Sequence, residues 1–219
     1  MVERDTAFLV GFGAAFDEIA ADLAAYAPAF AWQLRRAASV AALAQSVDTL
    51  LEGLPQAANV FIAVDSNAVN YARLELYGPA RLRGHRLATL VHPNAHVAPD
   101  AQLGDNVWIG PGAIVGSGCK LGSDVLVNAG ARLDAGVQVG MHGWIGAGAS
   151  IGAATQLGSH VVVGADVRLG AGLQIGKHCV LTQPGFWAQS FPAGTFLEPG
   201  YPEPARMIGA AYSWQPRRA

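Results

Sequence analysis

An aliphatic residue at every sixth position constrains the fold of this chain more than any other feature. From Val97 to Leu181 this column runs without a break through fifteen positions, and the residue after each is usually Gly. The fourth residue after each is usually small or β-branched, and Cys119 and Cys179 occupy two of these places. A period of six is typical of a parallel β-helix, in which three hexapeptides make one triangular coil and the column points inward. We therefore expect about five stacked coils over residues 91–185, with both cysteines as unreactive core thiols.

The three outward faces of the expected prism differ in polarity. The first face is apolar, the second is mixed and the third is rich in glutamine, as their outward residues show: Trp108, Leu126, Trp144, Val162 and Val180; Ile114, Arg132, Ser150 and Arg168; Gln102, Lys120, Gln138, Gln156 and Gln174. Monomers rarely expose an apolar patch of that size, so we expect a partner or the C-terminal tail to cover the first face. A cyclic homotrimer is the natural arrangement. The glutamines are expected to face solvent or to form a side-chain ladder.

Residues 1–90 have a different sequence pattern, which is typical of a small Rossmann-like α/β domain. Apolar runs predict strands over 7–10, 29–34 and 59–64, and amphipathic stretches between and after them predict helices over 17–26, over 39–54 and after 67. This alternation predicts a small parallel sheet with crossover helices. The turn Gly11-Phe12-Gly13 follows the first strand, where open α/β sheets usually bind a ligand. Because Phe16 replaces the third glycine of the dinucleotide fingerprint, a purely structural turn is the main alternative.

Charge and composition exclude several classes of function. The net charge is −2 and the 14 Lys and Arg residues are scattered, so no nucleic-acid partner is expected. The 31 residues between Asp134 and Asp166 carry no Asp, Glu, Lys or Arg, but they are dense in Gly and repeat with a short period, which argues against a membrane span. Two cysteines and an acidic start give no sign of a disulfide framework or a signal peptide, so we expect a cytoplasmic protein.

The order of these parts resembles the NeuD-like sugar acetyltransferases, which include sialic acid O-acetyltransferases and the N-acetyltransferases of bacillosamine and perosamine biosynthesis. The resemblance extends over roughly residues 7–208, through the α/β unit, the coils and three motifs: Val91-His92-Pro93, Pro192-Ala193-Gly194-Thr195 and Pro204-Ala205-Arg206-Met207. It implies a left-handed β-helix and a homotrimer with acetyl-CoA in a cleft between neighbouring subunits. It also implies a nucleotide sugar as acceptor, and a histidine base beside an acid.

Several functional positions of this family are occupied by other residues here. The base and its acid fall on Ala135 and Gly136, neither of which can take a proton. A second histidine, which lines the acetyl-CoA site, falls on Trp144, and we expect Trp144 and Ala165 to line that site. The acceptor loop and the position after the third strand also depart from the family pattern, and they supply the expected acceptor-binding residues Gly11, Phe12, Gly13 and Asp65.

Three histidines spaced by 18 residues, His142, His160 and His178, should stack at one corner of successive coils. One interpretation is that they are turn residues, because His tolerates a left-handed backbone. Another is that His142 is a displaced general base, with Asp134 the carboxylate nearest the lost base position. A third is metal binding, but imidazoles that point outward in parallel do not converge as zinc requires, so no metal is expected. The candidate catalytic residues are therefore His142 and Asp134.

Two functions are consistent with these patterns. The first is an acyl-CoA-dependent acyltransferase that uses acetyl-CoA to modify an amino or hydroxyl group of a small, nucleotide-linked sugar, with a displaced base or mainly by positioning. The second is a non-catalytic trimeric scaffold or binding module that keeps the fold without the site. The aromatic, proline-rich residues 186–219 are expected to cap the last coil or to close over the donor cleft.

Overall fold

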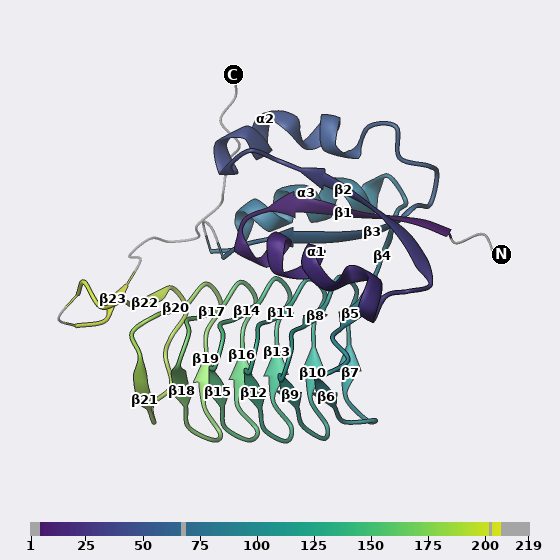
Figure 1. Ribbon diagram of the computed structural model, residues 1–219. Coiled ribbons are helices and arrows are strands. Elements are labelled where there is room, and N and C mark those ends of the chain that lie inside the picture. The colour runs from purple at the N-terminus through teal and green to yellow at the C-terminus, as the bar shows by residue number, and fades with distance from the viewer. Residues whose placement is uncertain (1–4, 67–68, 202, 207–219) are drawn as a thin grey trace.

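The computed structural model describes residues 5–66, 69–201 and 203–206, and it places an α/β domain along one face of a β-helix (Figure 1). In the α/β domain four parallel strands form a sheet in the order β2-β1-β3-β4. Its elements are β1 (Asp5–Phe12), α1 (Ala14–Tyr26), β2 (Phe30–Arg36), α2 (Val40–Leu51), β3 (Asn59–Val64), α3 (Tyr71–Leu82) and β4 (Arg86–Leu87). The predicted parallel sheet with crossover helices is confirmed. None of the described helices is both long and apolar enough to cross a membrane.

Alternation along the strands gives the two sides of this sheet different neighbours. Phe8 and Val10 of β1 pack in one cluster with Leu50 of α2 and Leu76 of α3. Leu9, between them in sequence, packs in another cluster with α1 and the β-helix. Successive side chains of a strand point to opposite sides, so one side of the sheet carries α2 and α3 while the other meets the β-helix through α1.

Three sheets form the faces of the β-helix, and successive coils add one short parallel strand to each face; the exception is β23 at the end of the first face, which pairs antiparallel with β22. The first face contains β5 (Leu90–Val91), β8 (Trp108–Ile109), β11 (Leu126–Val127), β14 (Trp144–Ile145), β17 (Val162–Val163), β20 (Val180–Leu181), β22 (Thr195–Leu197) and β23 (Ala205–Arg206). The second contains β6 (His96–Val97), β9 (Ile114–Val115), β12 (Arg132–Leu133), β15 (Ser150–Ile151), β18 (Val167–Leu169) and β21 (Gly185–Trp187). The third contains β7 (Gln102–Leu103), β10 (Lys120–Leu121), β13 (Gln138–Val139), β16 (Gln156–Leu157) and β19 (Gln174–Ile175).

The register of the coils confirms which residues point inward. Val127 pairs with Ile109 on one side and with Ile145 on the other, so equivalent residues lie one coil apart. The aliphatic column is buried at every position from Ile109 to Leu181. The period of six in the sequence is therefore the period of the β-helix core.

The interior of the coils holds both cysteines, and close approach of the coils favours glycine at the corners. Cys119 and Cys179 are fully buried, and burial raises the pKa of each thiol, as expected for core residues. Gly146 shows why glycine so often follows the column: a Cβ there would lie 2.5 Å from the carbonyl carbon of Gly164 in the next coil. The next coil lies too close to Gly146 for any side chain there, whereas Asn128 and Asp134 occupy the equivalent position in other hexapeptides.

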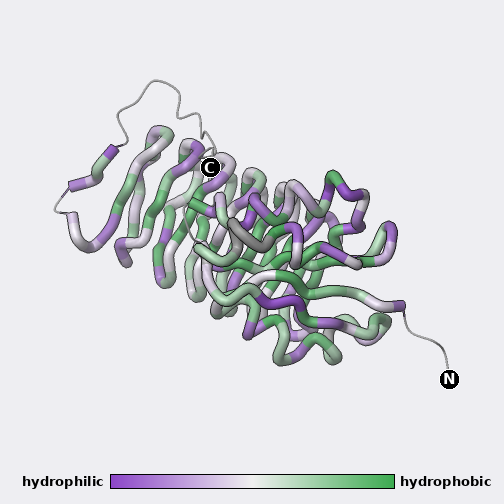
Figure 2. The backbone as a smooth tube through the Cα atoms, turned by 90° about the horizontal axis from the view of Figure 1, so that it is seen from above, coloured by the Kyte–Doolittle hydropathy of each residue, from purple (hydrophilic) through white to green (hydrophobic). Residues whose placement is uncertain are grey.

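The protein's own α/β domain covers the apolar first face at Trp108 and Leu126, and there the expectation of a partner or tail is wrong. Trp108 and Leu126 are buried in one cluster with Phe16 and Ile19 of α1. The α/β domain lies over the earlier coils, and the last coils extend beyond it (Figure 2). The period of six identifies an apolar face but not its cover, because the α/β sheet has an apolar side of its own to bury. The apolar first face therefore no longer supports a homotrimer, which stays a prediction.

The segment expected to cap the β-helix begins as a continuation of it. Phe186 and Trp187 belong to β21, which pairs with β18. Strand β22 pairs with β20 and so covers the strand edge at the first face. Residues 207–219 lie outside the described part of the chain, and a capping role for the C-terminal segment as a whole stays a prediction.

Candidate functional site

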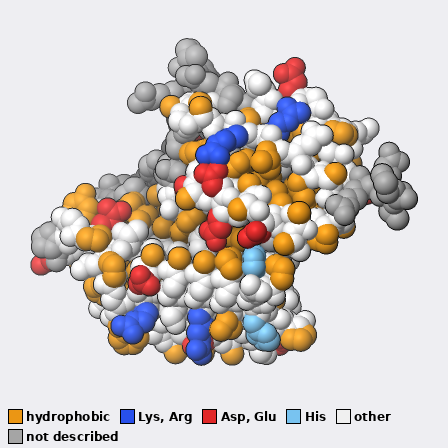
Figure 3. Space-filling model, viewed as in Figure 1, with side chains coloured by type: hydrophobic (Ala, Val, Ile, Leu, Met, Phe, Trp, Pro, Cys, Tyr) orange, Lys and Arg blue, Asp and Glu red, His pale blue; other side chains and the backbone are white. Residues whose placement is uncertain are grey.

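A pocket of about 370 Å³ lies where the α/β domain meets the β-helix. Its lining comes from the start of α1, from the segment after β3, and from the first face and the corner that follows it: Ala14, Ala15, Glu18, Asp65, Ser66, Asn128, Trp144, Gly146, Ala147 and Ala165. Acidic side chains gather along the junction of the two parts (Figure 3). The structure brings together three residues that the sequence analysis assigns to a site, Asp65, Trp144 and Ala165.

Asp65 caps the N-terminus of α1 from a distant part of the chain. The backbone amides of Ala14 and Ala15 donate hydrogen bonds of 3.0 and 2.9 Å to its two carboxylate oxygens. A helix N-terminus has unsatisfied amides and a partial positive charge, and both attract an anion. Here the anion is part of the chain, because β3 lies beside β1 and Val64 pairs with Phe12 at the end of both strands.

The three expected loop residues shape the turn between β1 and α1. Gly11 lies against β3, where a Cβ would come within 1.8 Å of the Ala63 carbonyl oxygen. Gly13 has a φ of 95°, and a Cβ there would lie 2.3 Å from the Asp65 carboxylate. Phe12 packs toward α2 and α3. Among the residues that the structure describes, these three are outside the pocket lining, and their acceptor-binding role stays a prediction.

The stacked histidines occupy the corner of the β-helix that α3 covers. His142, His160 and His178 have φ values of 59°, 59° and 60°, as expected of turn residues. Neighbouring ring centroids lie 4.7 and 5.2 Å apart, and Tyr71 of α3 stacks on His160 at 4.5 Å. The Tyr71 hydroxyl also lies 3.0 Å from His178 Nε2. The imidazoles therefore face α3, whereas the repeat pattern predicts that they point outward.

His142 belongs to a buried charge network that joins the two parts. Its Nδ1 lies 2.8 Å from Asp124 Oδ2, which also accepts a 2.8 Å hydrogen bond from Arg73 Nε. Arg73 donates further bonds to the carbonyl oxygens of Asp124 and Gly143, at 2.9 and 3.0 Å. The side chains of Arg73 and Asp124 are fully buried. The pair fixes α3 on the β-helix, because separating them would leave a buried charge without its partner.

Two features of this corner escape the sequence analysis. Arg73 lies on the buried side of α3 with Leu76 and Tyr77, and a charge on an apolar helix face is the signal of a buried partner. Asn106, one coil before Asp124, bonds the amide and carbonyl of Ile62 at 2.8 and 3.0 Å and so extends the edge of β3. Nothing in the period of six indicates these partners, because they come from another domain.

Two histidines of this corner, His160 and His178, resist protonation. The pKa of His160 is lowered to about 4, first by burial and then by the neighbouring His142, while a hydrogen bond with the Val69 carbonyl opposes the shift. Burial also lowers the pKa of His178, and Lys177 adds to this effect. The packing of α3 on the stack therefore favours the neutral form of His160 and His178.

Acid should destabilise this junction. A histidine whose pKa is lowered by folding binds a proton more readily in the unfolded chain, so its stabilising contribution is complete above pH 6.5 and is lost as the pH falls toward 4. The expected loss from His160 is at most about 3 kcal/mol. Urea denaturation across this pH range measures it. His160→Asn, which tolerates the same backbone, should decline less steeply than the wild type, and equal slopes would contradict the assignment.

Asp134 and Ala135 lie at a different corner of the β-helix, between the second and third faces. Asp134 is partly exposed and pairs with Arg132 at 2.7 Å. As far as the structure describes the chain, neither Asp134 nor His142 lines the pocket, so a catalytic role for either stays a prediction. The described residues also contain no group of three His, Cys, Asp or Glu side chains placed to hold a metal ion.

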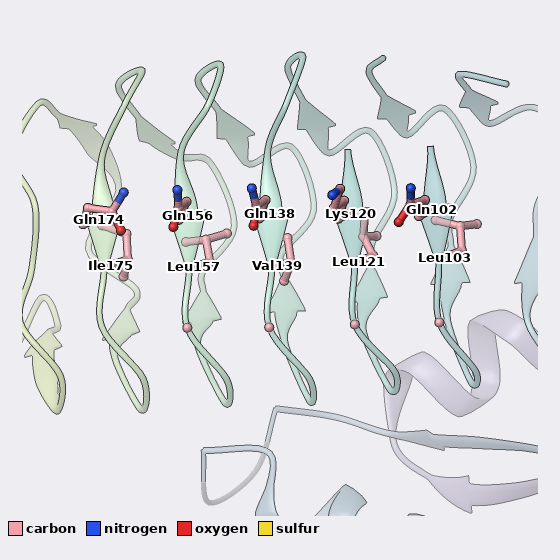
Figure 4. A pocket seen from close by; sticks show the side chains of 14 residues that line it. Gln102, Leu103, Lys120, Leu121, Gln138, Val139, Gln156, Leu157, Gln174 and Ile175 are labelled. Carbon is pink, nitrogen blue, oxygen red and sulfur yellow. The ribbon is translucent and has the colours of Figure 1, made fainter. Parts of the chain in front are cut away.

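The glutamine-rich third face forms an open groove of about 550 Å³ along the β-helix (Figure 4). Gln138 pairs in register with Lys120 and Gln156, and the outward residues of this face are all exposed. The expected exposure of the third face is confirmed. This groove is separate from the pocket beside α1, with which it shares no lining residue among those described.

Comparison with family models finds a match over β4 and the β-helix only. The family model described as the GMPPB C-terminal domain matches residues 86–185. No curated protein matches the chain at a significant level.

Solved structures match both parts together. The acetyltransferase domain of PglB from Neisseria gonorrhoeae FA1090 has a TM-score of 0.74 at 20% identity, over 88% of this chain and 96% of that chain. The same domain in complex with acetyl coenzyme A has a TM-score of 0.73 at 20% identity, over 88% and 95%. PerB from Caulobacter crescentus, in complex with CoA and GDP-perosamine, has a TM-score of 0.62 at 22% identity, over 87% and 92%. These likenesses establish the fold class, an N-terminal α/β domain followed by a left-handed β-helix.

Proposed function

We propose that this protein is an acyl-CoA-dependent acyltransferase that moves an acetyl group from acetyl-CoA to an amino or hydroxyl group of a small sugar. The observation that carries this proposal is the shared two-part architecture, since 88% of the chain matches an acetyltransferase domain that holds acetyl coenzyme A. The pocket between the two parts, with Trp144 and Ala165 in its lining, has the volume of a small-molecule site.

The chemistry is the transfer of an acyl group from sulfur to nitrogen or oxygen. The acceptor atom attacks the thioester carbonyl carbon, the C–S bond breaks, and the sulfur leaves with the bonding electrons as the CoA thiolate. The proton of the acceptor passes to a base, to the thiolate or to solvent. Ala135 and Gly136 can take no proton, so we expect most of the acceleration to come from holding donor and acceptor together, which supplies about 7–11 kcal/mol in well-oriented reactions.

Three finer parts of the sequence-based hypothesis stay predictions. The homotrimer, with the donor between neighbouring subunits, rests on the family resemblance, and the cytoplasmic location rests on the two cysteines and the acidic start. A nucleotide-linked acceptor has support from PerB, which is seen with GDP-perosamine. The pocket of this chain instead presents the Asp65 carboxylate where a helix N-terminus would hold a phosphate.

A non-catalytic scaffold or binding module is the second candidate, and one observation favours it. The positions that carry the base and acid in the resembling family are Ala135 and Gly136, at an exposed corner. A chain that had lost its chemistry would keep the coils, because the aliphatic column alone specifies them.

Release of the CoA thiol from acetyl-CoA, with a panel of amino and hydroxyl sugars as acceptors, tests the enzyme. We expect the CoA thiol to be released faster when an acceptor sugar is present than when it is absent. The kcat of His142→Asn should stay within about 3-fold of the wild type, because the imidazole is enclosed beneath α3. Asn also tolerates the φ of 59° at this position. A fall of kcat by about 10²- to 10⁴-fold would assign the general base to His142. No acceptor-dependent release with any sugar would favour the scaffold.

A further inference from the structure

We propose that Asp65 takes the place of a bound phosphate at the N-terminus of α1, so that the pocket selects a phosphate-free sugar and excludes a diphosphate-linked one. This inference rests on the proposed function only in calling the bound molecule an acceptor. The binding preference itself follows from the residues of the pocket.

The amides that would hold a phosphate are already in use. Ala14 and Ala15 are the first two residues of α1, and their N–H groups point at Asp65 with hydrogen bonds of 3.0 and 2.9 Å. A phosphate at a helix N-terminus needs these same donors and the same partial positive charge. An entering phosphate would therefore have to displace a carboxylate that covalent connection keeps in place.

The turn is built to receive this carboxylate. Gly13 stands at the N-cap position with no side chain to cap the helix, and its φ of 95° suits glycine. A Cβ at Gly13 would lie 2.3 Å from Asp65 Oδ2. The Asp65 carboxylate thus occupies the space that a side chain at Gly13 would need. It supplies the helix cap that Ser, Thr or Asp at the N-cap would normally provide.

The charge of the pocket also opposes a phosphate. Its described lining contains two carboxylates, Asp65 and the exposed Glu18, and no Lys or Arg. Arg36, which pairs with Asp17 of α1, lies outside the described lining and is held in that ion pair. A diphosphate would bring about two further negative charges to this site, and like charges placed together are a common means of rejecting a wrong ligand.

The remaining residues suit a sugar ring. Trp144 offers an aromatic surface, Ser66 a hydroxyl and Asn128 an amide whose nitrogen is bonded to the Ile145 carbonyl at 2.7 Å. Carboxylates accept hydrogen bonds from sugar hydroxyl groups and pair with an ammonium group. Alanine and glycine make up the other walls, so the pocket has room for a ring beside the tryptophan. A free amino sugar matches this combination of charge and surface.

The test compares one sugar with and without phosphate. Glucosamine and glucosamine 1-phosphate are titrated calorimetrically into the wild type, Asp65→Gly and Asp17→Asn, with no acetyl-CoA present. We expect the wild type to bind glucosamine at least about 10-fold more tightly than its phosphate. Asp65→Gly frees both amides and should abolish or invert this preference. Asp17→Asn removes a negative charge from the same helix turn but leaves Asp65 on the amides, so it should keep the wild-type preference.

Three outcomes would overturn the inference: a wild type that prefers the phosphate, a preference that Asp65→Gly leaves unchanged, or no binding of either sugar to the wild type. If Asp65→Gly does not fold, Asp65→Asn serves instead, because it removes the charge while keeping one acceptor oxygen for the helix. Since no donor is present, failure here leaves acetyl transfer standing. Failure to bind acetyl-CoA, in contrast, would overturn the proposed function and leave the phosphate preference intact.

Discussion

Val127→Asp is expected to prevent the β-helix from folding. Val127 is fully buried between Ile109 and Ile145 of the adjacent coils, so a carboxylate there would have no water and no hydrogen-bond donor provided for it. The penalty is several kcal/mol, against a total stability of about 5–15 kcal/mol for a typical protein. Each coil contacts only its neighbours, so a fault in a middle coil divides the stack. Circular dichroism and urea denaturation report the loss.

The matched control places a new carboxylate on the outside of the same β-helix. Gln138→Glu adds a negative charge on the exposed third face, beside Lys120, and should change the free energy of unfolding by less than about 0.5 kcal/mol. A Val127→Asp protein as stable as Gln138→Glu would contradict the assignment of inward and outward residues.

Asp124→Asn is expected to lower the free energy of unfolding by about 3–5 kcal/mol, because it leaves the fully buried Arg73 without its carboxylate. Asparagine keeps the shape of the side chain and tolerates the φ of 61° at this corner, so the loss reports the charge. Chemical denaturation followed by tryptophan fluorescence measures it. Adding Arg73→Met to Asp124→Asn should recover part of the loss, since no buried charge then remains unpaired.

A second ion pair between α3 and the β-helix provides the control. Arg81 and Asp105 are paired across the same junction, but both side chains are about half exposed. Asp105→Asn should therefore cost less than about 1 kcal/mol. Equal effects of Asp105→Asn and Asp124→Asn would show that Arg73 does not anchor α3.

The β-helix could be predicted from the sequence because its contacts repeat. One period fixes the column, the coil length and the identity of all three faces, and the structure has each of them. The N-terminal parallel sheet was also predictable, since Val60 to Val64 and the other apolar runs are bounded by turn residues. The period does not indicate what packs on each face, so it does not predict that α1 covers Trp108 and Leu126.

The candidate site shows the same division. The family resemblance assigns Trp144, Ala165 and Asp65 to a site, and the structure places them in one pocket. The contact of Asp65 with the start of α1 depends on strand order, which brings the end of β3 beside the end of β1. A usable signal was present, because Gly13 leaves α1 without an N-cap side chain and an acidic residue follows the neighbouring strand. The burial of His142 behind Arg73 had no such signal in the repeat.

Calorimetric titration of the folded protein with acetyl-CoA tests the proposed acyltransferase most directly. We predict saturable binding to one site per chain, with a dissociation constant between about 1 μM and 1 mM, the range in which enzymes commonly bind substrates. We expect only the acetyl end of the donor to enter the pocket, with its diphosphate outside, so Trp144→Ala should weaken this binding. Gln138→Glu, outside the described lining of the pocket, should leave it unchanged. CoA without the acetyl group should compete with acetyl-CoA for the same site. Heats no larger than dilution at about 1 mM acetyl-CoA, in a wild type shown to be folded, would contradict the enzyme and leave the non-catalytic β-helix scaffold in its place.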